Sequence, residues 1–188
     1  IKAANTTGNE NTAVGHYALD ASSGANENTA MGYQSLTSCT TGEGHAAFGW
    51  RSLTATTTAN DNTAFGHAAV RDTTTGSENT ALGSGALDAN TTGNANTAVG
   101  RMSLTTQTTA VENTAIGYYA MNACTTGGLN TAIGDHAGNS ITTGTKNVCL
   151  GRYAGSGQLT TATGELWIAR SNDSYNNATT WIHGDSSG

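Results

Sequence analysis

Five histidines are the side chains in this sequence best suited to bind a metal ion or to exchange protons in catalysis. His16 and His67 occupy the same position of a 17-residue repeat, three repeats apart, so stacking the repeats as strands of a sheet separates them by about 14 Å. That distance is too long for one shared metal ion. No His-x-x-His or Cys-x-x-Cys spacing occurs around these or around His45, His136 and His183. We therefore expect no metal and no cofactor.

A second set of reactive groups is a column of carboxylates, where a column means the residues at one position of successive repeats. Glycoside hydrolysis needs two carboxyl groups about 5 to 9.5 Å apart in a cleft, and a thin rod of stacked repeats has no obvious cleft. A solvated ladder that keeps sheet edges from aggregating is the better interpretation. We therefore expect no enzymatic activity. The column consists of Glu10, Glu27, Asp61, Glu78 and Glu112.

The three cysteines predict no disulfide bond. Cys39 and Cys124 share one repeat position and lie five repeats apart, which corresponds to about 24 Å. A disulfide joins Cα atoms that are closer than about 7 Å. We expect these two residues and Cys149 to be small, mostly buried thiols that say little about the cellular compartment.

Most aromatic residues follow a glycine of the repeat, at the positions that vary most within the chain. Variation inside one chain means that the fold does not require a particular residue type at these positions, so we expect them on an exposed corner. Two interpretations stay open: the residues stack sugar rings or grip a protein receptor, or they form a tolerant surface or a contact between protomers. The candidates are His16, Tyr17, Tyr33, Trp50, Arg51, Tyr118, Tyr119, Arg152 and Tyr153.

The elements that position these side chains are predicted by the repeat itself. A word Asn-Thr-Ala-x-Gly, or a degenerate copy, starts at nine positions spaced by 17 residues. The residue before each glycine is apolar, and a second apolar column begins at Leu19 and Leu36. This pattern predicts two short strands per coil of a parallel β-solenoid, an all-β fold of about ten coils over residues 1–155. The nine starts are Asn11, Asn28, His45, Asn62, Asn79, Asn96, Asn113, Asn130 and Asn147.

Several columns have predicted roles within each coil. The asparagines are expected to form a ladder of side-chain hydrogen bonds, and the glycines after the strand to take a positive φ or a close backbone approach. Thr-Thr-Gly words mark the other corner. Because residues i and i+2 of a strand face the same way, Thr12 and Val14 either both face inward or both face a partner chain. Ala13 and its copies are one candidate contact face.

The repeat stops after Gly155, and residues 156–188 are predicted to form a separate cap or junction. Residues 164–171 and 179–185 have the β-branched and aromatic character of strands, and the polar segment between them suits a turn. We therefore expect a terminal β-hairpin in which Trp167 and Trp181 provide the packing.

Composition excludes some partners and favours self-association. The net charge is −6 with only seven Lys and Arg in no cluster, so no basic stripe exists for nucleic acid. No apolar run reaches membrane-spanning length. A narrow solenoid buries little surface per residue and has open ends. We therefore expect the rods to bundle as homo-oligomers.

The Asn-Thr-Ala-x-Gly coils resemble the heads of trimeric autotransporter adhesins, and more closely the repeat regions of phage-type tail fibres. The segments that match the fibres are Gly134-Asp135-His136-Ala137-Gly138, Gly151-Arg152-Tyr153-Ala154-Gly155, Leu166-Trp167-Ile168-Ala169 and Trp181-Ile182-His183-Gly184-Asp185. The resemblance implies a left-handed parallel β-roll, a homotrimer, and a self-cleaving chaperone domain of the kind that often follows such fibres.

These observations predict a structural and adhesive fibre segment on a virion tail or cell-surface appendage, outside the cell, that recognises a host glycan or protein receptor. Two alternatives stay open. A Thr-rich β-solenoid can bind ice, although Thr40 and Thr41 would point to opposite faces of a strand. A glycan-degrading tailspike fragment is the other, and it requires a carboxylate pair in a cleft.

Overall fold

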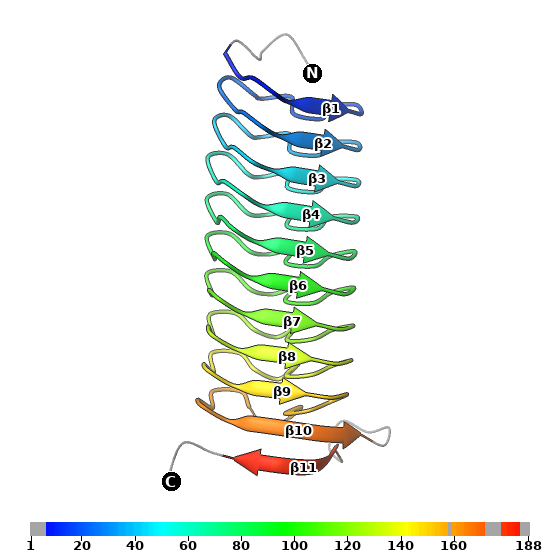
Figure 1. Cartoon of the computed structure of the whole chain (residues 1–188), viewed down its shortest axis with the longest axis vertical. Helices are drawn as coiled ribbons and strands as arrows, with labels where there is room; N and C mark the ends of the chain where they lie inside the picture. The colour runs from blue at the N-terminus through cyan, green and yellow to red at the C-terminus, as the bar shows by residue number, and fades with distance from the viewer. Residues whose placement is uncertain (1–6, 158, 172–177, 185–188) are drawn as a thin grey trace.

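The chain forms a straight rod of stacked coils with a hairpin at its C-terminal end (Figure 1). This computed structural model describes residues 7–157, 159–171 and 178–184. Strands β1 to β10 are parallel and follow one another in chain order within one sheet, and β11 pairs antiparallel with β10. The strands are β1 Thr12–Val14, β2 Thr29–Met31, β3 Ala46–Phe48, β4 Thr63–Phe65, β5 Thr80–Leu82, β6 Thr97–Val99, β7 Thr114–Ile116, β8 Thr131–Ile133, β9 Val148–Leu150, β10 Leu166–Ser171 and β11 Ala178–Gly184.

The predicted all-β parallel solenoid is confirmed, but the prediction of two strands per coil is wrong. Each full coil has one three-residue strand. The second apolar column lies in a series of turns, where Tyr17 and Leu19 have φ values of 60° and 51°. Left-handed residues bend the chain back toward its strand within a few positions. Their amides still bond the next coil, as from Leu19 N to Ser35 O at 3.0 Å.

The strands place alanine inward and the residues on both sides of it outward. Ala30, Ala81 and their equivalents in β2 to β9 are buried, and Ala13 of β1 is partly buried. They pack with the column that contains Leu36 and Leu87. The threonine and the apolar residue of each strand face outward together, as in Thr80 and Leu82. The prediction that the alanine column is a contact face is therefore wrong. Only a methyl group fits between the strand and the leucines because the coil is so thin.

The asparagine ladder is confirmed. The carbonyl oxygen of the Asn79 side chain accepts hydrogen bonds from the backbone N–H and the side-chain amide of Asn96, at 3.1 and 3.0 Å. The Asn79 amide donates to Gly93 O at 2.8 Å, across the coil. Both asparagines are buried. Each amide therefore ties the start of a strand to the opposite corner and to the next coil.

The hairpin continues the sheet past the last full coil. Leu166, Trp167 and Ile168 of β10 pair in parallel with Val148, Cys149 and Leu150 of β9. Trp167 shares the inward register of Cys149 and packs, partly buried, against the core. The predicted strands are confirmed, while the intervening turn and the side chain of Trp181 lie outside the described residues. The domain boundary after residue 155 stays a prediction.

His45 takes the place of asparagine in the ladder and copies its hydrogen bonds. Its Nδ1 accepts from the Asn62 backbone N–H at 3.2 Å, so the proton is on Nε2, which donates to Ala59 O at 2.7 Å. The Asn28 side chain accepts from the His45 backbone N–H at 2.9 Å. Burial lowers the pKa of His45 from 6.5, although the bond to Ala59 O partly offsets it. A proton on Nδ1 would break the bond to Asn62.

His45→Asn should therefore make the rod less sensitive to acid. The folded pKa is depressed, so the stability from neutral His45 is fully present above pH 6.5 and is lost as the pH falls toward the folded pKa. The free energy of unfolding then falls by up to about 1.4 kcal/mol per pH unit for one titrating group. Urea unfolding at pH 7.5, 6.5 and 5.5 measures the difference, with wild type as control because all other titrating groups are shared. Equal pH slopes in the two proteins would contradict this role.

Candidate functional site

The residues after each glycine line one side of the rod and form two aromatic clusters. The N-terminal cluster begins with His16 stacked on Tyr17, with ring centroids 3.8 Å apart, and continues through Tyr33 to Trp50. Trp50 in turn stacks on His67 at 4.5 Å with planes 12° apart. The Arg51 guanidinium lies 5.1 Å from the Trp50 ring centroid, a cation–π contact.

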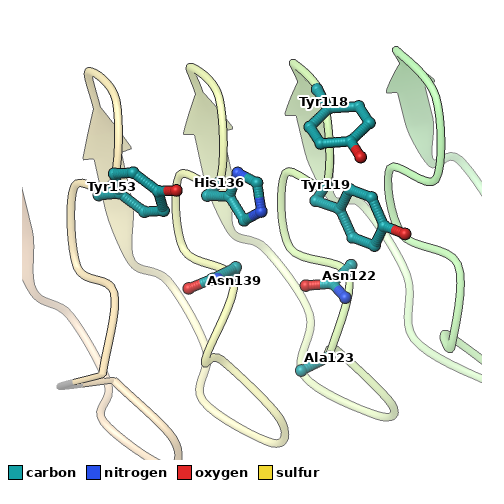
Figure 2. A pocket seen from close by; sticks show the side chains of 7 residues that line it. All are labelled: Tyr118, Tyr119, Asn122, Ala123, His136, Asn139 and Tyr153. Atoms are coloured by element: carbon teal, nitrogen blue, oxygen red, sulfur yellow. The ribbon is translucent and has the colours of Figure 1, made fainter. Parts of the chain in front are cut away.

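The C-terminal cluster consists of Tyr118, Tyr119, His136 and Tyr153. Tyr119 and His136 are stacked with planes 9° apart, and His136 lies 4.9 Å from Tyr153. Tyr118 meets Tyr119 edge-on at 4.5 Å. Figure 2 shows the rings of Tyr119, His136 and Tyr153 in one row along successive coils. Two arginines frame the row, since Arg101 lies 5.9 Å from the Tyr119 centroid and Arg152 lies 4.9 Å from that of Tyr153.

A groove of about 690 Å³ lies beside this second row. It is lined by the four rings and by Asn122, Ala123 and Asn139. Figure 2 shows Asn122 and Asn139 in a second row parallel to the rings. Tyr118 is 46% exposed and forms the open rim, whereas Tyr153 is only 9% exposed and forms the buried end. The groove therefore has aromatic and amide groups facing a common space, the combination typical of small-ligand sites.

Asp135 holds the middle of the row in place. Its carboxylate accepts from His136 Nδ1 at 2.7 Å and from Arg152 Nε at 3.0 Å. Desolvation would raise the pKa of Asp135, but the hydrogen bonds from Arg152 and His136 outweigh it and lower the pKa. The ionised carboxylate thus orients the imidazole between the two tyrosines.

A charged cluster lies beside the N-terminal rings. Arg71 donates to Asp72 at 2.9 Å and pairs with Asp88 at 3.2 Å. The hydrogen bond from Arg71 lowers the pKa of Asp72, whereas burial raises that of Asp88 despite the same arginine. Because both carboxylates are already paired with Arg71, this cluster resembles a structural ion-pair network.

The structure thus divides the predicted candidates into two groups. His16, Tyr17, Tyr33, Trp50 and Arg51 join the first cluster, and Tyr118, Tyr119, Arg152 and Tyr153 join the second. Ser84 and Gly85 interrupt the aromatic run between them. The candidate set omitted the two ring members His67 and His136, the framing Arg101, and the groove-lining Asn122 and Asn139.

A third surface is the outward face of the strands. We call it the apolar face. Its large exposed side chains range from 56% exposed for Phe65 to 38% exposed for Ile116. Phe48 and Phe65 stack at 5.5 Å, and a small apolar groove runs between them and Met31. The full set is Val14, Met31, Phe48, Phe65, Leu82, Val99, Ile116, Ile133 and Leu150.

Metal-binding and thiol chemistry gain no support from the described residues. No group of three His, Cys, Asp or Glu side chains there could hold a metal ion. The three cysteines are buried and unpaired, as predicted. Burial raises the pKa of Cys39 and Cys124 to about 11 and that of Cys149 to about 12, so these thiols are protonated and unreactive at neutral pH. No helix in the described part could cross a membrane.

No family model matches the chain, and neither a curated protein nor a solved structure matches it significantly. The resemblance to phage-type tail fibres and adhesin heads therefore stays a prediction.

Proposed function

We propose that this chain is a non-catalytic fibre segment that assembles from several copies of itself and carries recognition surfaces along its length. The observation that carries the proposal is the apolar face, which extends along nine successive coils on a regular sheet. A soluble monomer rarely exposes so large an apolar patch, and such patches mark association sites. A second copy of this chain is the occupant that fits, because it offers an equally long and regular apolar face.

Three copies around one axis are the arrangement that the resemblance to tail fibres implies. Each copy would turn its apolar face to the axis and leave the C-terminal aromatic cluster free for contacts outside. The large rings of Phe48 and Phe65, next to the smaller Leu82 and Val99, would set the register between copies. A virion tail or a cell-surface appendage outside the cell is the setting that we propose, with a host glycan or protein as receptor.

The two alternatives have less support. Ice binding favours two exposed threonine rows on one flat face, but the Thr40 hydroxyl donates to Thr57 O at 3.1 Å, and of that pair only Thr41 is exposed. On the strands, the outward threonines share their face with bulky apolar groups. A glycan-degrading fragment needs two carboxylates at its cleft, and the groove beside Tyr119 is lined by none.

Light scattering of the purified chain tests the assembly. We expect a mass of three times 19.0 kDa for wild type and 19.0 kDa for Phe65→Asp/Ile116→Asp, because a buried unpaired charge is strongly unfavourable in an apolar interface. The matched control is Thr75→Asp/Thr126→Asp, which places the same charges on the same coils at an exposed corner. Its mass should equal that of wild type. A monomeric wild type, or a double variant on the apolar face that keeps its mass, would refute the proposal.

A further inference from the structure

We propose that the groove beside Tyr119 binds carbohydrate, with an oligosaccharide lying along the rod. This assignment deepens the recognition role of the proposed function and rests on it. The ring row of Tyr119, His136 and Tyr153 would contact the C–H face of a sugar, while Asn122 and Asn139 would bond its hydroxyl groups.

The first argument is that the stacked rings leave part of their faces uncovered. Tyr119 and His136 are parallel within 9° with centroids 5.4 Å apart. Stacked carbon atoms touch at about 3.5 Å, so the rings are displaced sideways by about 4 Å. Of the rings that line the groove, Tyr118 is 46% exposed and Tyr119 is partly exposed, so these two offer ring surface to a ligand.

The second argument is that the side-chain amides of Asn122 and Asn139 do not bond a neighbouring coil, unlike the threonines found at the same position of some other coils. In three other coils this position is a threonine whose hydroxyl bonds a backbone carbonyl, as from Thr37 to Tyr17 O and from Thr105 to Gly85 O, both at 3.0 Å. The remaining coils have Asp20, Arg71, Asp88 and Ser156 there. Within the described part of the chain, the side chains of Asn122 and Asn139 form no such bond. Each amide offers two donors and an acceptor, which suits sugar hydroxyls because these groups also donate and accept.

The third argument is spacing and charge. Successive coils repeat the amides at about 4.8 Å, close to the length of one sugar unit in an extended chain. The groove lining has no carboxylate, lysine or arginine. Its one imidazole, His136, is bonded to Asp135, which is also bonded to Arg152. A largely neutral ligand rich in hydroxyl groups fits this site better than a charged peptide or a nucleic acid.

The test is a printed glycan array, followed by calorimetry with the best hit and with cellotetraose, maltotetraose and chitotetraose. Tyr119→Ala should weaken binding by about tenfold or more, because the ring supplies the stacking surface. The variant should fold, since Ala68 occupies the same column with a φ of 54°. Asn122→Thr/Asn139→Thr introduces the residue that Thr37, Thr54 and Thr105 provide in this column. It should also lose about tenfold in affinity with unchanged or higher thermal stability.

Tyr33→Ala in the N-terminal cluster is the control and should keep the wild-type affinity. The proposal is overturned if wild type binds no glycan above the Tyr119→Ala background, or if both groove variants bind as wild type does. The outcome is independent of assembly. A monomer that binds sugar would support the assignment of the groove and refute the proposed fibre assembly. A trimer that binds no sugar would refute only the assignment of the groove.

Discussion

Gly83→Ala should destabilise the rod by about 3 kcal/mol or more. Gly83 has a φ of 140°, which side-chain-bearing residues rarely adopt, and an added Cβ would lie 2.6 Å from the carbonyl carbon of Gly100 in the next coil. Backbone atoms on both sides are held by inter-coil hydrogen bonds, such as Gly83 N to Phe65 O at 2.9 Å. Neither coil can move away without breaking its ladder.

Gly85→Ala is the matched control, two residues along the chain. Gly85 also has a positive φ, at 67°, but the equivalent Ala68 adopts 54° without a glycine. Its added Cβ would meet only the sulfur of Met102, at 2.7 Å, the end of a flexible side chain. We expect a loss of about 1 kcal/mol or less.

Urea unfolding monitored by circular dichroism separates the two glycine variants. Because stability in a solenoid is a sum over neighbouring coils, hydrogen exchange around β5 and β6 should show the Gly83 defect as a local loss of protection. Similar midpoints for Gly83→Ala and Gly85→Ala would show that the close approach of the coils does not limit the fold.

The period of the repeat was enough to predict the coil, the strand register and the asparagine ladder, but not which way each strand faces. A three-residue strand such as Thr80–Leu82 puts its two ends on one face and its middle residue on the other. Burial of the larger apolar group is the usual outcome, yet here Ala81 is buried and Leu82 is exposed. The deciding quantity is the narrow space inside one coil, which a sequence pattern does not contain.

The second strand was predicted wrongly because the leucine column adopts a backbone conformation that leucine seldom has. Leu87 has a φ of 54°, which costs an L-residue roughly 1 to 2 kcal/mol. The sequence does contain a sign of it, since Gly138 and Gly155 replace leucine in that column. The core volume is then restored from elsewhere: Ile141 and Leu159 fill the space that the missing side chains leave.

For the candidate site, the sequence identified the columns that form the aromatic clusters but not which rings contact one another. The variable positions after each glycine did gather into aromatic clusters. Pairing Tyr119 with His136 required the coil geometry, because stacking occurs between residues 17 apart. Asn122 and Asn139 could have been noticed only as consecutive amides in a variable column that also holds Thr37, Arg71 and Asp88.

Asn96→Ala should lower the free energy of unfolding by about 3 to 5 kcal/mol, because it leaves several buried groups without their hydrogen-bond partner at once. The Asn96 amide donates to Asn79 Oδ1 and to Ala110 O, both at 3.0 Å, and its oxygen accepts from the Asn113 backbone N–H at 3.0 Å. These groups are buried, so water cannot replace the lost side chain without entering the core. The penalty for leaving them unpaired exceeds the loss of the hydrogen bonds themselves.

Asn96→His is the variant that distinguishes hydrogen bonding from volume. His45 already occupies this column and bonds both the next backbone N–H and the opposite carbonyl. At pH 7.5, Asn96→His should therefore recover most of the stability that Asn96→Ala loses, and it should lose that stability again on acidification, because protonated Nδ1 no longer accepts from Asn113. Urea midpoints for the three proteins at pH 7.5 and 5.5 measure both effects. If Asn96→Ala unfolds at the wild-type midpoint, or if Asn96→His is no better than alanine at pH 7.5, the ladder does not stabilise the rod.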